Sequence, residues 1–296
     1  KLYKKLHSWL LSQNSSSLLN QSIKAEELFR KVGITFNVYG EDEAEERLIP
    51  FDFVPRIIEK KEWDFVKSGI VQRLTAINLF LKDIYYDQKI VKEGIIPSEL
   101  INNNSAFKPQ MCGFSPPGDI YIHVSGVDLI RTSKKNFYVL EDNLRVPSGA
   151  SYMIENRSTM MHMFPELFTN YNVHNVYNYP DLLLKSLIKC SNNLSHNPNI
   201  AVLTPGIFNS AYFEHSFLAD EMGVNLLEWR DLIIEDNKVV IKTTKGKEII
   251  DILYRRIDDD YLDPLTFNPD SLIGLPGLFD VYLSLIHISE PTRPVM

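Results

Sequence analysis

The chain has 296 residues, 44% of them hydrophobic and 23% charged, which is enough to bury one large core or two smaller ones. The net charge is −7, from 31 basic and 38 acidic side chains, and the N-terminal string KLYKK is the one dense basic block. This balance argues against nucleic acid or an anionic membrane as the main partner and favours a small molecule.

Cysteine content and hydropathy bear on the cellular compartment. Cys112 and Cys190 are the two cysteines and show no CxxC spacing, so the sequence predicts neither a disulfide framework nor a zinc site. No apolar run approaches the roughly 18 residues of a membrane-spanning helix, and the N-terminus lacks the pattern of a signal peptide. We therefore expect a cytoplasmic protein.

The N-terminal part is predicted to contain two helices and a strand. Residues 1–30 carry apolar positions at helical spacing on both sides of a serine-rich stretch. Residues 33–40 (GITFNVYG) are β-branched and aromatic, which predicts a strand, and the acidic residues 41–46 predict a loop. The prolines in residues 47–58 favour extended chain.

A long helix and a β-hairpin are predicted next. Residues 62–87 repeat apolar side chains every three or four positions, which is typical of an amphipathic helix. Residues 119–143 run through DIYIHVSGVDLIR, the polar string TSKKN and FYVLEDN, and this order predicts two strands joined by a turn.

The second half of the chain alternates strands and helices. Residues 156–167 predict a helix, and the polar residues 189–199 mark a boundary. A buried-type strand (NIAVLTPG), a helix closed by Gly223, the strand VNLLEW and two or three more strands follow. This β-α-β order implies a parallel, Rossmann-like sheet, so we expect an α/β protein of mixed α+β character, divided near residue 198.

The end of the predicted hairpin offers several oxygen ligands. If the turn is centred between residues 134 and 135, Asp128 lies directly opposite Glu141, with Cβ atoms roughly 4.5–5.5 Å apart. Because side chains alternate along a strand, Asn143 shares a face with Glu141, whereas Asp142 points the other way.

Two opposed carboxylates suggest a bound cation. Their repulsion costs up to about 1 kcal/mol in a plain hairpin, and oxygen ligands favour Mg²⁺ or Mn²⁺ over zinc. Mg²⁺ takes one or two protein carboxylates and fills its shell with water and phosphates, so this patch predicts a platform for a magnesium nucleotide. The alternative is that Asp128 and Glu141 merely pair with Arg131 or Arg145, and a slip of one residue would remove the patch.

The segments around the hairpin resemble a known family. VDLIR and FYVLEDNLRVPSGASYMIENR are similar to sequences of the circularly permuted ATP-grasp family, type 2, a relative of the glutathionylspermidine synthetase fold. Further similar blocks stand in the same order, namely GITFNVYG, ERLIPFDFVPRII, GIVQRLTAINLFLKDIY, LTPGIFNSAYFEHSFLADEMGV and ILYRRIDDDYLDPLTF. The resemblance covers about residues 30–282 and implies the N-terminal portion of a permuted ATP-grasp fold, joined to a Rossmann-like unit.

This resemblance implies an ATP-dependent carboxylate–amine ligase that forms an amide through an acyl phosphate. Its cofactors would be ATP and Mg²⁺ or Mn²⁺, and its partners small-molecule or peptide carboxylates and amines. Related ligases hold the metal with an Asp on one strand and a Glu-x-Asn on the next, which corresponds here to Asp128, Glu141 and Asn143. Arg131 and Arg145 would be catalytic residues that neutralise developing charge.

Six further residues are expected to bind substrate. They lie in a Pro-Ser-Gly turn, at a strand-to-helix junction and after a strand, where N–H groups and guanidinium groups favour anions: Ser148, Gly149, Asn209, Ser210, Arg255 and Arg256. For each, a turn, a helix cap or an internal ion pair is the alternative role. The pair Glu214 and His215 is more typical of packing than of acid–base catalysis. Related synthetases carry a substrate-contacting Arg where this chain has Gly126, which leaves the substrate open.

The expected organisation is N-terminal helices (1–30), an ATP-grasp portion with the metal hairpin (31–198), a Rossmann-like substrate-side unit (199–282) and a tail (283–296). The tail, LSLIHISEPTRPVM, looks like translated sequencing adapter, and we expect the natural protein to continue past Tyr282. The resemblance places the phosphate-gripping lysines and the adenine pocket in that later part. We therefore expect this fragment alone to be inactive.

Two other functions stay open on the sequence alone. One is a non-catalytic nucleotide-binding or scaffold member of the same fold. The other is a kinase-like enzyme that phosphorylates its substrate without forming an amide. The sequence carries no prediction of the oligomeric state.

Overall fold

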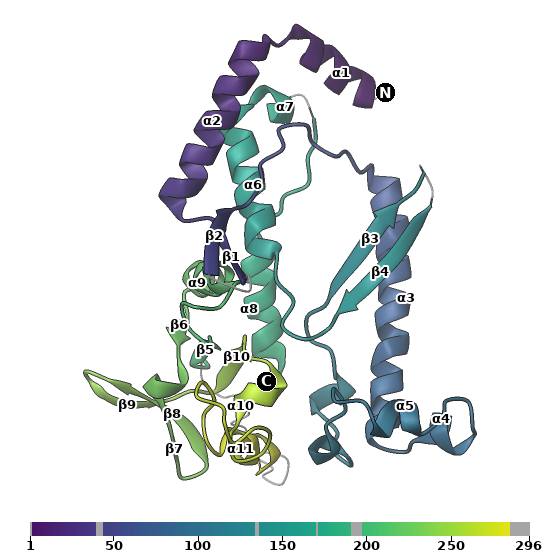
Figure 1. The fold of residues 1–296 in the computed structure, drawn as a ribbon, viewed down its shortest axis with the longest axis vertical. Helices are drawn as coiled ribbons and strands as arrows, with labels where there is room; N and C mark the ends of the chain where they lie inside the picture. Colours follow the sequence, from purple (N-terminus) through teal and green to yellow (C-terminus); the bar gives the residue numbers. More distant parts are fainter. Residues whose placement is uncertain (1, 40–43, 134–135, 170, 191–196, 285–296) are drawn as a thin grey trace. The chain divides into compact units, whose positions relative to one another are not determined.

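The computed structural model describes residues 2–39, 44–133, 136–169, 171–190 and 197–284. The chain divides into two units: residues 58–147, here called the hairpin unit, and residues 1–57 with residues 148 onward, here called the split unit (Figure 1). None of the helices in the described ranges has both the length and the apolar character of a membrane span. The expected mixed α/β fold is confirmed.

The split unit contains most of the secondary structure. Its helices are α1 (Leu2–Ser12), α2 (Ser15–Val32), α6 (Ala150–Met163), α7 (Glu166–Thr169), α8 (Tyr179–Cys190), α9 (Tyr212–Met222), α10 (Asp259–Leu262), α11 (Leu278–Ser284) and the 3-10 turn η3 (Trp229–Asp231). Its strands are β1 (Thr35–Tyr39), β2 (Ala44–Leu48), β5 (Ile200–Leu203), β6 (Asn225–Leu227), β7 (Leu232–Glu235), β8 (Lys238–Thr243), β9 (Gly246–Ile249) and β10 (Ile252–Arg255).

A three-stranded parallel sheet forms the core of the split unit, as predicted. The strand order is β10-β5-β6, and α9 connects β5 to the parallel strand β6. Ala201, Leu203 and Leu253 are fully buried in the main apolar cluster. Helices α8 and α9 contact each other and the strands of this sheet, as the helices of a Rossmann-like sheet do. The strands β7, β8 and β9 form a separate antiparallel sheet.

The two predicted N-terminal helices are present. The side chain of Asn14 accepts the N–H of Ser16 and caps the start of α2. Gly33, with a φ of 76°, ends α2 in the left-handed conformation that glycine adopts without strain. Leu6 of α1 belongs to an apolar cluster with Phe164, so α1 packs near the end of α6.

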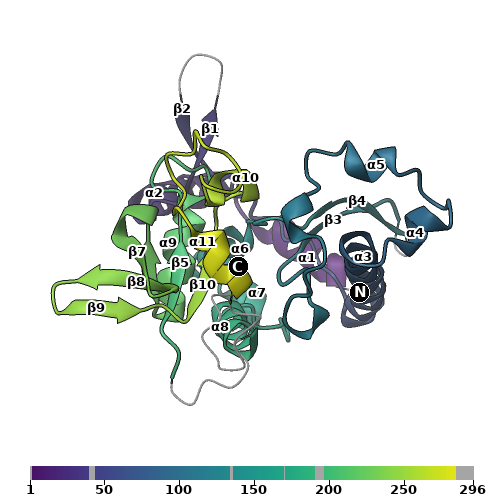
Figure 2. The same ribbon diagram turned by 90° about the horizontal axis from the view of Figure 1, so that it is seen from below.

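The hairpin unit is built on one long helix. Its elements are α3 (Lys60–Tyr85), α4 (Lys89–Lys92), α5 (Glu99–Asn102), the 3-10 turns η1 (Pro109–Met111) and η2 (Pro117–Asp119), and the strands β3 (Gly126–Arg131) and β4 (Phe137–Asn143). Both views show the antiparallel pair β3-β4 alongside α3 (Figures 1 and 2). The side chain of Asn78 on α3 bonds the backbone of Asp119, Tyr121 and Ile122, so the chain enters β3 from a fixed position.

Several sequence expectations differ from the structure. The acidic loop is shorter than expected, because residues 44–48 pair with β1 as strand β2. The first hairpin strand begins at Gly126, and residues 119–125 are not in a strand. Helix α6 begins at Ala150 rather than Asn156 and ends before Pro165, which lacks the N–H that would continue it.

Some elements of the structure were not predicted, and some predicted segments lie outside the described residues. Helix α8 and strand β7 were not expected from the sequence. Residues 191–196 of the expected boundary and residues 285–296 of the expected tail lie outside the described residues. The domain division near residue 198 stays a prediction; in the structure, residues 148 onward share one unit with the parallel sheet.

Truncation of Leu253 tests the position of the core. Leu253→Ala should lower the free energy of unfolding by about 2–5 kcal/mol, because the side chain is fully buried in strand β10 of the parallel sheet. Leu272→Ala is the matched control, since that leucine is 83% exposed and should change stability little. Urea unfolding followed by circular dichroism measures both. Equal losses in the two variants would contradict the described core.

Candidate functional site

The register of the hairpin places Asp128 opposite Glu141, as the count from the turn predicted. The assumed turn centre holds only for this end, because Leu129 pairs with Val139 and Arg131 with Phe137. Leu140 is therefore an extra residue in β4, a β-bulge that shifts the register by one between Leu129 and Asp128. Without the bulge, Asp128 would face Leu140.

The bulge gives the hairpin two unlike faces. The outer face consists of the exposed side chains Asp128, Ile130, Tyr138, Leu140, Glu141 and Asn143. The inner face consists of partly buried side chains together with two charged ones that pair with α3: Val127, Leu129, Arg131, Phe137, Val139 and Asp142. Consecutive exposure of Leu140 and Glu141 is the local mark of the bulge.

Three oxygen-bearing side chains gather at one end of the outer face. The Asn143 amide N–H donates to Glu141 Oε1 at 3.1 Å, so these two side chains are in contact and Asn143 keeps its carbonyl oxygen for another partner. In the part of the chain that the structure describes, neither Asp128 nor Glu141 has an ion-pair partner. The two facing carboxylates are thus exposed and uncompensated.

This donor set suits a partly protein-bound Mg²⁺ or Mn²⁺. Among the described residues no three His, Cys, Asp or Glu side chains form a cluster, so two carboxylates and one amide are what the patch provides. Mg²⁺ uses that number of protein carboxylates when water and phosphate oxygens complete its shell. The residues present fit such an ion.

The two predicted catalytic arginines lie in different settings. Arg131 is on the inner face, where its guanidinium pairs with Glu62 of α3 at 2.5 Å and stacks over Phe137. It is not brought to the patch. Arg145 follows β4 and is exposed, with no ion pair among the described residues. The alternative in which these arginines neutralise Asp128 and Glu141 is not what the structure shows.

Asp142, the residue between Glu141 and Asn143, is held on the inner face. Arg73 of α3 donates to both oxygens of Asp142, from Nε at 2.9 Å to each and from Nη2 at 2.6 Å. These hydrogen bonds lower the pKa of Asp142 below its ordinary value. The carboxylate is only 14% exposed, whereas the Arg73 side chain is 45% exposed.

A second polar group lies buried in the split unit, around Glu214 of α9. One oxygen of Glu214 accepts the N–H of Gly149 at 2.7 Å and both the N–H and the hydroxyl of Ser151, at 3.0 and 2.9 Å. Arg256, after β10, approaches the other oxygen at 3.5 Å. Glu214 therefore satisfies the N-terminus of α6 from within the protein.

This arrangement assigns internal roles to two residues predicted to bind substrate. The side chains of Arg256 and Glu214 are 1% and 2% exposed, so the guanidinium does not reach solvent. Removing one charge of such a pair leaves the other buried, at a cost of about 3–5 kcal/mol. The N–H of Gly149 is occupied as well, whereas the neighbouring Ser148 is exposed.

Asn209 and Arg255, also predicted to bind substrate, have local partners. Asn209 accepts the N–H of Ala211 at 2.9 Å in an Asx turn before α9. Arg255 pairs with Asp259 at 2.5 Å and donates to the carbonyl of Ile257, which is the internal ion pair considered as its alternative role. Ser210 is partly buried in the same turn as Asn209.

His215 is neutral in the fold. Its Nδ1 lies 2.9 Å from the hydroxyl of Thr204 at the end of β5. Burial first, and then the charge of Arg256, lower the pKa of His215 to about 3. A base this weak agrees with the expected packing role.

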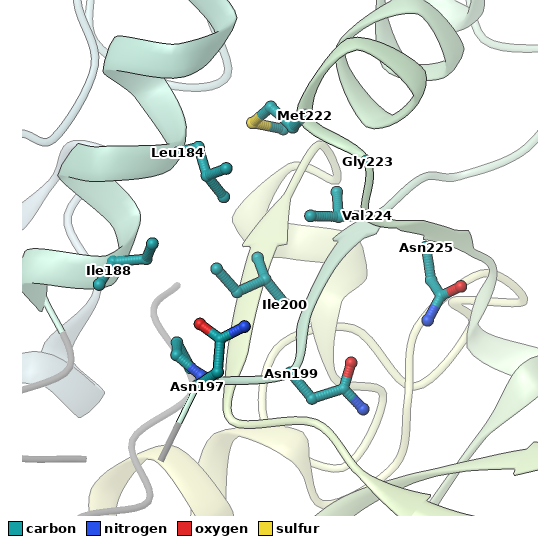
Figure 3. Close-up of a pocket in the computed structure, with 10 residues that line it drawn as sticks. Leu184, Ile188, Asn197, Asn199, Ile200, Met222, Gly223, Val224 and Asn225 are labelled. Atoms are coloured by element: carbon teal, nitrogen blue, oxygen red, sulfur yellow. The ribbon is translucent and has the colours of Figure 1, made fainter. Parts of the chain in front are cut away.

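A small pocket lies at the amino ends of strands β5 and β6 of the parallel sheet (Figure 3). It encloses about 260 Å³ and is lined by α8, the start of β5 and the segment between α9 and β6: Leu184, Ile188, Asn197, Pro198, Asn199, Ile200, Met222, Gly223, Val224 and Asn225. Ligands of open α/β sheets bind beyond the carboxyl ends of the strands, and this pocket lies at the amino ends. We assign it no function.

Comparison with known proteins identifies the family. The family model described as a circularly permuted ATPgrasp matches residues 55–285. The chain belongs to the circularly permuted ATP-grasp family. The matching model carries the number 1, not the type 2 that the resemblance suggested.

Two bacterial relatives are 45% identical to this chain. One is an uncharacterized protein of Synechocystis sp., matched over 94% of this chain and 58% of its own length. The other is an uncharacterized protein of Mycobacterium tuberculosis, matched over 93% and 49%. The chain thus spans about half the length of these relatives.

A named relative and a solved structure complete the comparison. A protein of Frankia casuarinae, provisionally named a glutamate–cysteine ligase, is 38% identical over 83% of this chain and 28% of its own length. The structure of a glutathione synthetase-like effector from Globodera pallida has a TM-score of 0.54 and 13% identity, covering 91% of this chain and 64% of that one. At that identity the likeness concerns the fold alone.

The residues that pair with Arg131, Asp142 and Arg256 were not predicted from the sequence. Glu62 and Arg73 stand 11 residues apart, about three helical turns, so both lie on one side of α3; this spacing is the signal that was available. Glu214 gave a weaker signal, as one acidic residue among the aromatic side chains of α9.

The buried His215 predicts a pH dependence of stability. Below about pH 6.5 the unfolded chain binds a proton at this residue, whereas the folded chain does not do so until about pH 3, so stability should fall as the pH drops through this window. The slope from this group is up to about 1.4 kcal/mol per pH unit. The free energy of unfolding, measured with urea, should fall less between pH 7 and pH 5 for His215→Asn than for the unmodified protein.

The same substitution at the exposed His162 is the control for this experiment. The control variant should show the same difference in the free energy of unfolding between pH 7 and pH 5 as the unmodified protein. If His215→Asn also leaves that difference unchanged, His215 is not the buried neutral group described.

Proposed function

We propose that the outer face of the hairpin binds the magnesium complex of ATP, in a protein that joins a carboxylate to an amine at the expense of ATP. The observation that carries this proposal is the exposed pair Asp128 and Glu141, opposed across the strands without a cationic partner among the described residues. Asn143, in contact with Glu141, completes a set of ligands for Mg²⁺. Membership of the permuted ATP-grasp family supports the nucleotide.

Apolar side chains beside the patch support a nucleotide rather than a free metal ion. Ile130, Tyr138 and Leu140 are 45%, 60% and 66% exposed on the same outer face. Ile130 and Tyr138 are directly paired across the strands. Such a surface next to metal ligands suits an organic ligand with apolar parts better than a lone metal ion.

The proposed reaction has two transfers. A substrate carboxylate oxygen attacks the terminal phosphorus of ATP and ADP leaves, giving an acyl phosphate. The amine nitrogen then attacks the acyl carbon, phosphate leaves, and a proton is lost as the amide forms. Mg²⁺, when bound, would neutralise phosphate charge during the first transfer.

Within this reaction the chain's own residues have defined tasks. Asp128, Glu141 and Asn143 would hold and orient the metal–phosphate group. We propose Arg145 as the arginine nearer to catalysis, because it is exposed, whereas Arg131 would first have to leave Glu62.

The name of the Frankia relative supports a proposal for the substrate class. Its name suggests that an amino acid supplies the carboxylate and another the amine, and we propose small amino acids or peptides for this chain. Ser148 and Ser210 remain candidates for contact with them, whereas Gly149, Arg255 and Arg256 have internal partners. We also propose the cytoplasm as the compartment, since Cys112 and Cys190 are free thiols.

We propose that residues 31–198 contribute the metal hairpin and residues 199–282 the substrate side. The relatives are about twice as long as the matched region, so turnover is a property to be tested on a protein with the additional residues. In that protein ADP release should require Mg²⁺, a carboxylate and an amine. ADP release without amine dependence would favour the kinase-like alternative.

Removal of one carboxylate should weaken cation binding. Asp128→Asn and Glu141→Gln should each lower the affinity of this chain for Mn²⁺ in the presence of ATP by at least about tenfold, because each removes a direct ligand. Titration followed by electron paramagnetic resonance of free Mn²⁺ measures this change.

Glu93→Gln is the matched control, since it removes one exposed carboxylate from the same unit. It should bind Mn²⁺ as the unmodified chain does. If all three variants bind equally well, the cation does not bind between Asp128 and Glu141 and the proposal is wrong.

A further inference from the structure

Two ion pairs tie the hairpin to α3, one at each end of its inner face. Arg131 pairs with Glu62 near the turn, and Asp142 pairs with Arg73 at the end that carries the proposed metal ligands. Neither residue of α3 touches the outer face. Their effect on the site must therefore pass through the strands.

The spacing of the two pairs is the same on the helix and on the strand. Glu62 and Arg73 are separated by 11 residues, which is about 16.5 Å along a helix and close to a whole number of turns. Phe137, the cross-strand partner of Arg131, is separated from Asp142 by five residues, or about 17 Å along a strand. The helix and the hairpin thus match at both ends only in this alignment.

The order of the charges fixes the direction as well as the alignment. Along α3 the charges run negative then positive, and along the inner face of the hairpin they run positive then negative. Turning the hairpin end for end would bring Arg131 to Arg73 and Asp142 to Glu62. Both contacts would then be repulsive.

Asp142 also reports which register β4 adopts. In the bulged register it faces inward, and its neighbours Glu141 and Asn143 face outward. If the bulge were lost, Glu141 would pair with Val127 on the inner face and Leu140 would face Asp128. The metal ligands would then be on opposite sides of the hairpin.

We propose that Arg73 is a positioning residue, whose bidentate hydrogen bonds to Asp142 hold β4 in the bulged register. This register keeps Glu141 and Asn143 beside Asp128. The guanidinium is planar and matches both carboxylate oxygens, which a lysine cannot do. The role in metal binding rests on the proposed function. The role in setting the register does not.

The decisive variant is Arg73→Gln. An effect of charge alone and the loss of a positioning contact predict opposite changes in its affinity for Mn²⁺. Loss of a positive charge from the hairpin unit would by itself strengthen cation binding. Loss of the bond to Asp142 should weaken it, by about tenfold, as changes to supporting residues of metal sites do. Mn²⁺ titration of the intact chain separates the two, and Arg73→Lys should recover part of the affinity.

Lys60→Gln is a matched control. It removes the same charge from the same helix, where Lys60 is 85% exposed and pairs with Asp64 of that helix. This variant should bind Mn²⁺ at least as tightly as the unmodified chain. Wild-type or tighter binding by Arg73→Gln would overturn the positioning role.

Backbone nuclear Overhauser contacts across the strands test the register without any metal. The unmodified chain should show Asp128 next to Glu141, and Arg73→Gln should show contacts from Asp128 to Leu140 or lose the signals of this pair. Unchanged contacts in Arg73→Gln would overturn the proposal. If the unmodified chain fails to bind Mn²⁺, the proposed function is wrong, and this register measurement alone decides the role of Arg73.

Discussion

One extra residue in β4, Leu140, determines which side chains stand beside Asp128. The ladder nearer the turn pairs Arg131 with Phe137, and continued without interruption it would bring Leu140 opposite Asp128. The bulge moves Glu141 into that position and turns Asp142 toward Arg73. The outer face, with its carboxylates, its amide and its apolar neighbours, depends on this single shift of register.

The protein uses carboxylates in two contrasting ways, and the contrast separates a ligand site from a structural one. Glu214 is buried, accepts three hydrogen bonds from the start of α6 and lies next to Arg256. Its charge is therefore compensated by groups inside the fold. Asp128 and Glu141 are exposed, face each other and lack a cationic partner in the described ranges. A carboxylate pair in that state favours a cation from outside. The same contrast explains why the N–H of Gly149 and the guanidinium of Arg256 have partners inside the fold.

Local patterns were sufficient for most of the elements with strong periodicity, whereas the pairing of Asp128 with Glu141 was predicted correctly from a turn centre that was wrong. The pairing was predicted from an assumed turn centre that the rest of the ladder does not share, because a bulge is set by contacts such as Arg73 with Asp142 that no local pattern contains. Arg256 looked free in the sequence because its partner Glu214 lies 42 residues away. Likewise, α8 was missed, because only the polar segment that follows it was interpreted, as a boundary.

The central claim is that a divalent cation binds between Asp128 and Glu141, with Asn143 as the third protein ligand. Paramagnetic broadening of backbone amide signals by substoichiometric Mn²⁺ and ATP tests it most directly, because the broadening falls steeply with distance from the ion. The account predicts selective loss of the signals of Asp128, Glu141 and Asn143, while those of Gly149 and Arg256 persist. Broadening centred on other residues, or none at these three, would contradict it.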